Sequence, residues 1–195
     1  MTNYWKEKDQ FWRNKTLNNP AYEKQKKEAA GDILSILRTF NLKKVCDLGG
    51  YDGALGKCLP NVDYVCLDIK DGFDIASDWA EQKFIPDEDT LLVTSLTLIT
   101  LSPDQMVRTV SNFKTYGRLA YCYEEHWDGD DDKLFLQVND DYGGKWHHNL
   151  AKYFAPNVTD SIPSWLNPSW QRTIINLANH ENIRFPSDNE RRDEG

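Results

Sequence analysis

The sequence predicts an α/β fold with a doubly wound, mostly parallel sheet that is covered by helices on both faces. Short apolar runs typical of buried strands alternate with stretches whose apolar residues recur at helical spacing, which favours such a sheet. A run rich in glycine, residues 49–53, directly follows the first expected strand. In open α/β sheets, ligands bind at this position, beyond the carboxyl ends of the strands.

Length and composition favour one domain. The chain has 195 residues, of which 39% are hydrophobic and 12% aromatic, more aromatic residues than a disordered chain would carry. We expect N-terminal helices over residues 1–41, an α/β core over 42–185 and a frayed tail over 186–195. The net charge of −8 argues against broad electrostatic binding of nucleic acid. Without a membrane-length apolar run or a leader pattern at its start, the chain is expected to be cytoplasmic.

Two helices are expected before the first strand. In residues 4–18, aromatic side chains recur seven residues apart and share one helical stripe, which either packs on the domain or forms a lid over a cleft. Pro20 precedes a second helix that should end near Asn41. Its apolar residues follow 3.6-residue spacing, and its charged residues are expected to face solvent. These charged residues are Lys24, Lys26, Lys27 and Glu28.

The core elements follow in order. The expected strands cover Lys43–Leu48, Val62–Leu67, Phe73–Ala76, Thr90–Ser95 and Arg118–Tyr123. A helix is expected to start over Ala54–Leu59 and to stop at Pro60, and a second one runs from Pro103 to about Lys114 with Ser102 as its N-cap. Farther along, the pattern predicts a helix over Lys145–Phe154 and a late strand over Gln171–Leu177.

The glycine turn is the most informative stretch, and reads VCDLGGYDGALG over residues 45–56. A dinucleotide-binding G-x-G-x-x-G pattern would need glycine at position 51, where Tyr51 stands. The carboxylate of Asp47, inside the preceding strand, would repel a pyrophosphate and attract an ammonium group. The turn therefore favours a cationic ligand that carries no phosphate.

This stretch resembles motif I of the class I S-adenosylmethionine-dependent methyltransferases, h-h-D/E-h-G-x-G-x-G. Asp47, Gly49 and Gly53 match the motif, whereas Tyr51 departs from it at the middle glycine. The resemblance extends over roughly residues 43–123. It implies a Rossmann-like sheet of about seven strands with a final antiparallel strand, and S-adenosylmethionine as the cofactor.

The resemblance also implies which residues contact the cofactor. Asp68, at the end of the second strand, would accept hydrogen bonds from the ribose hydroxyls, and Asp78, beside Trp79, would recognise the adenine amino group. A surface acid at 68 and an ordinary N-cap at 78 are the alternatives. The full expected set is Asp47, Gly49, Gly50, Tyr51, Gly53, Asp68, Ile69, Asp78, Trp79 and Ser95.

Methyl transfer to oxygen usually needs a general base, and histidine suits this role at neutral pH. His126 follows the strand Arg118–Tyr123 and is the first candidate, with Glu124 or Glu125 to orient it. His147 and His148 are weaker candidates.

No metal site is expected. The acidic run 128–132 lacks the glycine and glutamate of an EF-hand loop and is expected to be a solvated loop. The four cysteines form no C-x-x-C pair, so we expect buried free thiols and no zinc.

The predicted function is methyl transfer from S-adenosylmethionine to an oxygen or nitrogen of a small-molecule or saccharide acceptor. Trp146, Trp165 and Trp170 form either an aromatic acceptor pocket or part of the core. One alternative is a catalytically silent cofactor-binding subunit. Another is an RNA methyltransferase with a local basic groove, formed by Lys6, Lys8, Arg13 and Lys15.

Overall fold

The computed structural model describes residues 20–135 and 145–178. The expected aromatic helix of residues 4–18, the basic residues of the alternative RNA groove and the tail 186–195 lie outside these ranges. No helix in the described part of the chain is long and apolar enough to cross a membrane.

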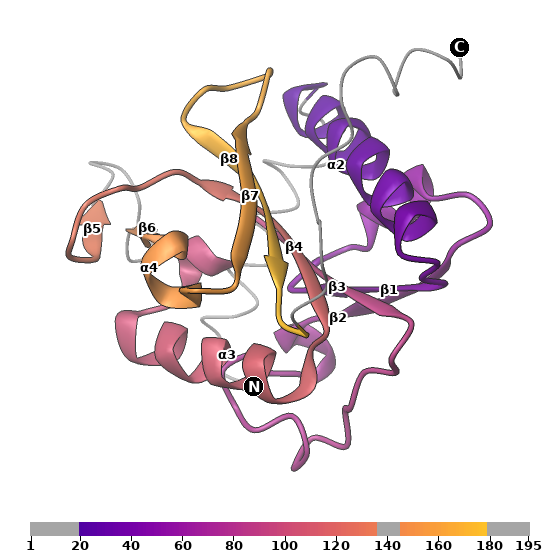
Figure 1. Cartoon of the computed structure of the whole chain (residues 1–195), viewed down its shortest axis with the longest axis horizontal. Coiled ribbons are helices and arrows are strands. Elements are labelled where there is room, and N and C mark those ends of the chain that lie inside the picture. Colours follow the sequence, from indigo (N-terminus) through magenta and orange to yellow (C-terminus); the bar gives the residue numbers. More distant parts are fainter. Residues whose placement is uncertain (1–19, 136–144, 179–195) are drawn as a thin grey trace.

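Six strands of the described residues form one sheet in the order β2-β1-β3-β4-β8-β7. Their bounds are β1 Lys44–Leu48, β2 Asp63–Leu67, β3 Thr90–Ser95, β4 Leu119–Glu125, β7 Val158–Pro163 and β8 Trp170–Asn176. The first four strands run parallel, and β8 is antiparallel to both of its neighbours (Figure 1). This confirms the mostly parallel sheet with a late antiparallel strand, although the described residues contribute six strands to it and not the expected number of about seven.

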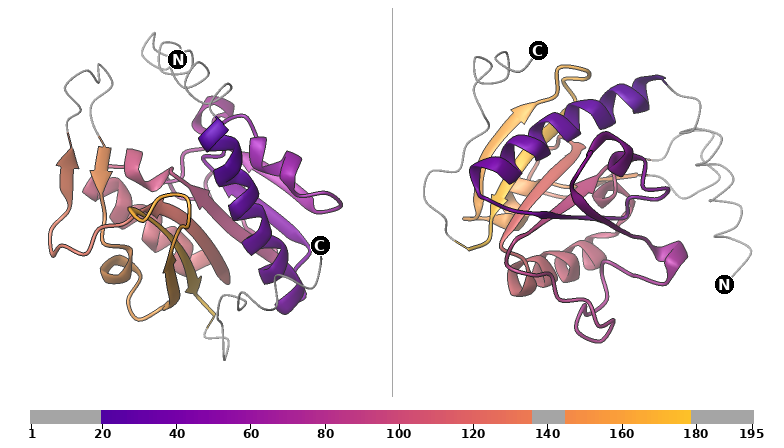
Figure 2. Two further views of the ribbon diagram at one scale, coloured as in Figure 1. Left: turned by 90° about the horizontal axis from the view of Figure 1, so that it is seen from above. Right: turned by 90° about the vertical axis from the view of Figure 1, so that its right-hand side faces the viewer.

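Helices cover both faces of this sheet. Helix α2, Pro20–Thr39, lies on one face, and α3, Pro103–Tyr116, lies on the other with the short α4, Leu150–Phe154 (Figure 2). On the α2 face, Ile33 packs into a cluster with side chains of β1, β3, β4 and β8. Because β1, β3 and β4 are buried on both sides, these parallel strands are mainly apolar, whereas the edge strand β2 is partly exposed.

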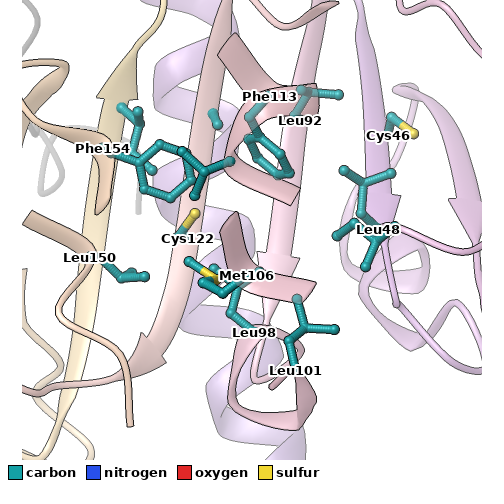
Figure 3. Packing of buried hydrophobic residues seen from close by; sticks show 14 of the residues in the cluster. Cys46, Leu48, Leu92, Leu98, Leu101, Met106, Phe113, Cys122, Leu150 and Phe154 are labelled. Atoms are coloured by element: carbon teal, nitrogen blue, oxygen red, sulfur yellow. The ribbon is translucent and has the colours of Figure 1, made fainter. Parts of the chain in front are cut away.

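The core on the α3 face is rich in large side chains. Met106 and Phe113 of α3 and Phe154 of α4 pack over Leu92 and Cys122 of the strands (Figure 3). The helix starts as the sequence predicts, because the Ser102 side chain accepts a hydrogen bond from the backbone of Gln105 and the Gln105 side chain accepts one from the backbone of Ser102. Such a capping box stabilises a helix start by about 1 kcal/mol.

Between the strands, one expected element is missing and another has a tighter helical form. The segment Phe73–Ala76 forms turns, because the carbonyl of Ile75 bonds the side chains of Trp79 and Asn112 and no neighbouring strand. The helix expected from Ala54 is a five-residue 3-10 helix, η1, Ala54–Cys58. The first crossover of the sheet is therefore short.

The C-terminal third differs most from the expectation. The predicted helix Lys145–Phe154 is divided into the strand β6, Lys145–His147, and α4, because the Asn149 side chain caps α4. Strand β6 pairs with β5, Lys133–Phe135, in a separate two-stranded sheet. The edge strand β7 was not predicted at all.

Candidate functional site

The candidate site lies where the strand order of the sheet reverses. Strand β1 lies between β2 and β3, and the chain leaves β1 in the glycine turn. The carboxyl ends of β1, β2, β3 and β4 meet at this edge because these strands are parallel. A strand-order reversal at the carboxyl edge is the usual place for a ligand crevice in open α/β sheets.

Close packing explains the two adjacent glycines of the turn. Gly49 has a φ of 75°, and a Cβ atom there would lie 2.2 Å from Cγ2 of Thr97. The Thr97 hydroxyl donates a hydrogen bond to the carbonyl of Gly49 at 3.2 Å. At Gly50, a Cβ atom would lie 2.3 Å from Oδ2 of Asp47. The glycines therefore bring the turn against the loop after β3 and against the carboxylate of β1.

Tyr51 stands at the middle glycine position of the motif and adopts a backbone conformation that favours glycine. Its φ is 53°, in the left-handed region, which costs a non-glycine residue about 1–2 kcal/mol. The backbone N–H of Tyr51 donates to Oδ2 of Asp68 at 3.0 Å, and the Lys70 ammonium lies 5.1 Å from the centre of the Tyr51 ring. The larger residue is thus accommodated by contacts with the end of β2.

Asp68 joins the end of β2 to the glycine turn. It caps the 3-10 helix η2, Ile69–Asp71, because Oδ1 accepts a hydrogen bond from the backbone of Lys70 at 3.1 Å. Its other oxygen accepts the bond from Tyr51. Since a carboxylate has about four acceptor positions, each oxygen retains capacity for a further donor. Ile69, beside it, is exposed.

Asp47 is fully buried at the carboxyl end of β1. The Tyr64 hydroxyl donates to Oδ2 at 2.6 Å, whereas Oδ1 has no hydrogen-bond partner in the described part of the chain. Burial raises the pKa of Asp47, and the nearby charge of Lys26 and the Tyr64 bond oppose that rise. A buried acceptor without a partner is unfavourable, which makes this oxygen a position for a donor.

Helix α2 brings two further polar side chains to the end of β3. Lys26 donates to the Ser95 hydroxyl at 3.1 Å, and the Gln25 amide donates to the same oxygen at 3.2 Å. Lys26 is only 3% exposed, which corrects the expectation that it faces solvent. No local pattern indicates this burial, because a charged residue in an amphipathic helix normally lies on the solvent side.

A buried ionic cluster holds α2 against the sheet. The Arg172 guanidinium of β8 contacts Glu28 at 3.2 Å and Asp32 at 3.0 Å. The hydroxyls of Tyr123 and Tyr121 donate to these carboxylates at 2.7 Å and 3.0 Å. Glu28 is therefore also buried, contrary to expectation. The cluster fixes the part of α2 that carries Lys26.

Glu124, at the end of β4, holds the loop after β3. Its Oε1 accepts a hydrogen bond from the backbone of Thr97 at 3.2 Å. Burial raises the pKa of Glu124 to about 7, and the polar groups of Thr94, Thr97 and Leu98 around the carboxylate offset part of the rise. Glu124 therefore supports the loop that contacts Gly49 and is not placed to orient His126.

The three candidate histidines differ in their contacts. His126 is exposed, and its backbone N–H donates to the carbonyl of Ser169. Nε2 of His147 lies 2.8 Å from Oε2 of Glu125, and the Lys145 ammonium contacts the other oxygen at 3.1 Å. The orienting carboxylate that we expected for His126 thus belongs to His147.

Burial lowers the pKa of His147, although the charge of Glu125 opposes this shift. Strand β6, which carries His147, packs against η3, Leu98–Thr100, in the loop that follows β3. His147 therefore lies on the same edge of the sheet as the glycine turn.

The structure gives His148 a structural position. Its Nδ1 lies 3.0 Å from Oδ1 of Asp132, and its Nε2 lies 3.0 Å from the carbonyl of Leu101. The Tyr153 hydroxyl bonds the other oxygen of Asp132. The end of the acidic run thereby anchors α4, and both nitrogens of His148 are engaged.

Asp78 and Trp79 are not brought to the glycine turn. The Tyr116 hydroxyl, at the end of α3, donates to Asp78 at 2.9 Å. Because α3 ends where β4 begins, this contact lies at the amino edge of the sheet. Trp79 is fully buried among aromatic side chains, including Phe113. Asp78 therefore caps a local turn, and Trp79 belongs to the core.

The three expected acceptor tryptophans are divided between two hairpins. Trp165 and Trp170 lie at the β7–β8 hairpin, where Trp165 covers Arg172 and Trp170 packs on Tyr123. Trp146 lies on β6. The four cysteines are free, as expected, but only Cys46 and Cys122 are buried, whereas Cys58 and Cys66 are half-buried.

No protein family model matches the sequence, and no curated protein sequence matches it. Solved structures do resemble it. The mitomycin 7-O-methyltransferase MmcR is 15% identical with a TM-score of 0.50, and the match covers 85% of this chain and 60% of that one. Human N-acetylserotonin methyltransferase in complex with SAM is 13% identical with a TM-score of 0.48, over 75% of this chain and 51% of that one. The N-terminal domain of EvdMO1, solved with SAH and D-fucose, is 11% identical with a TM-score of 0.46, and the match covers 77% of this chain and 81% of that one.

The chain thus spans about half to three fifths of the length of the first two of these proteins. At this identity the likeness concerns the fold. The mostly parallel sheet, with helices on both faces, is the Rossmann-like fold that S-adenosylmethionine-dependent methyltransferases share.

Proposed function

We propose that this chain transfers a methyl group from S-adenosylmethionine to an oxygen or nitrogen of a small-molecule or saccharide acceptor. The observation that carries the proposal is the glycine turn at the strand-order reversal, with Asp68 at the end of the adjacent strand. The similarity to MmcR, whose printed name is mitomycin 7-O-methyltransferase, supports it at the level of the fold.

The residues at the turn fit the proposed cofactor. S-adenosylmethionine carries a ribose with two hydroxyl donors and a cationic amino-acid tail, and when bound it supplies a methyl group activated by a sulfonium. Asp68 has acceptor capacity for hydroxyl donors, and Oδ1 of Asp47 lacks a donor. Gly49 and Gly50 lie too close to their neighbours to carry a side chain over this surface. Gly53 and Ile69 remain candidates for contact with the nucleoside.

For an oxygen acceptor, we assign the general base to His147. Its contact with Glu125 fixes the imidazole ring, and its lowered pKa keeps the ring neutral and able to accept a proton at pH 7. Among the described residues, no side-chain contact orients His126 in this way. His126 therefore becomes the second candidate, and His148 is not assigned a catalytic role.

Formation of S-adenosylhomocysteine tests the proposal. The purified chain would be incubated with S-adenosylmethionine and a panel of hydroxylated small molecules, amines and saccharides, with a transcribed RNA as a further arm. Formation that depends on a small-molecule acceptor supports the proposal. Cofactor binding without turnover on any acceptor would indicate the silent subunit, and turnover on RNA alone would contradict the proposed acceptor class.

A further inference from the structure

Two buried groups of opposite charge lie at the carboxyl ends of β1 and β3. Asp47 is fully buried, and Lys26 is 3% exposed. The charge of Lys26 acts on Asp47, yet no ion pair between them is present within 4 Å, and Lys26 instead donates to Ser95. The two charges therefore lie in one region without neutralising each other by direct contact.

Each group has hydrogen-bonding capacity that the described residues do not use. The ammonium of Lys26 has three donors. It donates to Ser95 and also interacts with Tyr22, whose ring centre lies 4.7 Å away, which leaves at least one donor for a ligand. Oδ1 of Asp47 and Oε1 of Gln25 are buried and have no partner in the described ranges. Buried polar atoms are normally paired, so a ligand that has both donors and acceptors would complete the hydrogen bonding of this region.

A zwitterionic ligand supplies both hydrogen-bond donors and acceptors. We propose that Lys26 binds the carboxylate of the methyl donor's amino-acid tail, while Asp47 accepts a hydrogen bond from its ammonium group. This inference rests on the proposed function and adds Lys26, on α2, as a specificity-determining residue that the glycine motif does not contain. Lys26 and Asp47 together distinguish an intact amino-acid tail from a nucleoside that lacks it.

The ionic cluster on α2 prepares Lys26 for this contact. Glu28 and Asp32 follow Lys26 within two helical turns, and both bind Arg172 of β8. An anchored helix restricts where the Lys26 side chain can lie before the ligand arrives. Less conformational freedom is then lost on binding, which favours affinity.

Calorimetric titration with three ligands tests the assignment. S-adenosylhomocysteine carries the whole tail, its decarboxylated form carries only the ammonium, and 5′-methylthioadenosine carries neither group. On the wild-type chain we expect S-adenosylhomocysteine to bind about tenfold more tightly than the decarboxylated form, because a charge-assisted contact is lost. Lys26→Met should weaken the binding of S-adenosylhomocysteine about tenfold and change the affinities of the two other ligands less than about twofold.

Lys24→Met is the matched control, because Lys24 is exposed on the same helix and the charge change is the same. It should leave all three affinities unchanged. Lys26→Arg keeps the charge and should keep the preference for the carboxylate, which provides a second variant if Lys26→Met folds poorly.

Three results would overturn the inference while the proposed function stands. The first is equal affinity of the wild-type chain for S-adenosylhomocysteine and its decarboxylated form. The second is an equal loss of affinity for all three ligands in Lys26→Met. The third is tighter binding of S-adenosylhomocysteine by that variant. The last result would mean that Lys26 competes with the ammonium of the donor. If none of the ligands binds the wild-type chain, the proposed function itself fails and the inference with it.

Discussion

Nε2 of His147 lies 2.8 Å from Oε2 of Glu125, a contact that joins the last residue of β6 to the last residue of β4. Glu125 therefore orients a residue 22 positions away and not its sequence neighbour His126. The same carboxylate binds Lys145, so β6 is held at the carboxyl edge of the sheet by two polar contacts. This arrangement determines which histidine we expect to act.

Replacing His147 should remove the proposed base. His147→Ala is expected to lower turnover on an oxygen acceptor about 10²–10⁴-fold, the usual contribution of positioned proton transfer. His126→Ala is the matched control and should retain near-normal turnover. Steady-state kinetics measures turnover in both variants. A larger loss of turnover in His126→Ala than in His147→Ala would assign the general base to His126 instead.

The rate should depend on pH through His147. Only the neutral imidazole accepts a proton, so turnover should fall as the pH drops through the pKa of His147. Burial lowers that pKa below its ordinary value of 6.5, so the rate should be near its plateau at pH 7. A pH–rate profile measured with saturating acceptor checks this, and a half-maximal rate above pH 7 would contradict it.

Glu124 should make the free energy of unfolding depend on pH. Its pKa is raised from 4.5 to about 7 in the folded chain, so the folded state holds a proton that the unfolded state releases in this range. Stability from this group is full below pH 4.5 and lost as the pH rises to 7, by roughly 3 kcal/mol. Urea unfolding at several pH values should show this decline in the difference between the free energies of unfolding of the wild type and of Glu124→Gln. If this difference did not change with pH, the decline could not be assigned to the titration of Glu124.

Breaking the cluster on α2 should cost much more than breaking a surface pair. Arg172→Met leaves Glu28 and Asp32 buried without their cation, which typically costs about 3–5 kcal/mol. Arg118→Met breaks the exposed pair with Glu88 and should cost less than about 1 kcal/mol. Denaturant unfolding of the two variants gives the comparison. Similar small losses would mean that the cluster does not hold α2.

The sequence predicted the elements whose signal is local. Strands β1, β3 and β4 are mainly apolar runs, and the residues of the α3 capping box lie three positions apart, so a short window contains each pattern. The prediction that Asp47, Gly49 and Asp68 contact the cofactor also rests on local signals, because the turn and the ends of β1 and β2 are adjacent in sequence or connected by a short crossover.

The remaining features depend on contacts between distant residues. Lys26 is buried because α2 is held by Arg172, about 150 positions away, and no helical pattern carries that information. Strand β7 is a half-exposed edge strand with an irregularity near Asp160, so it shows no apolar run. The partner of Glu125 depends on the β5–β6 hairpin, which the sequence pattern did not indicate.

Binding of S-adenosylhomocysteine tests the central claim most directly. Calorimetric titration of the wild-type chain should show saturable binding of S-adenosylhomocysteine and no comparable binding of NAD. Asp68→Ala, which removes the carboxylate that joins the turn to β2, should weaken S-adenosylhomocysteine about tenfold or more and leave the chain folded by circular dichroism. Binding of NAD without binding of S-adenosylhomocysteine would contradict the account, and unchanged affinity in a folded Asp68→Ala variant would remove Asp68 from the site.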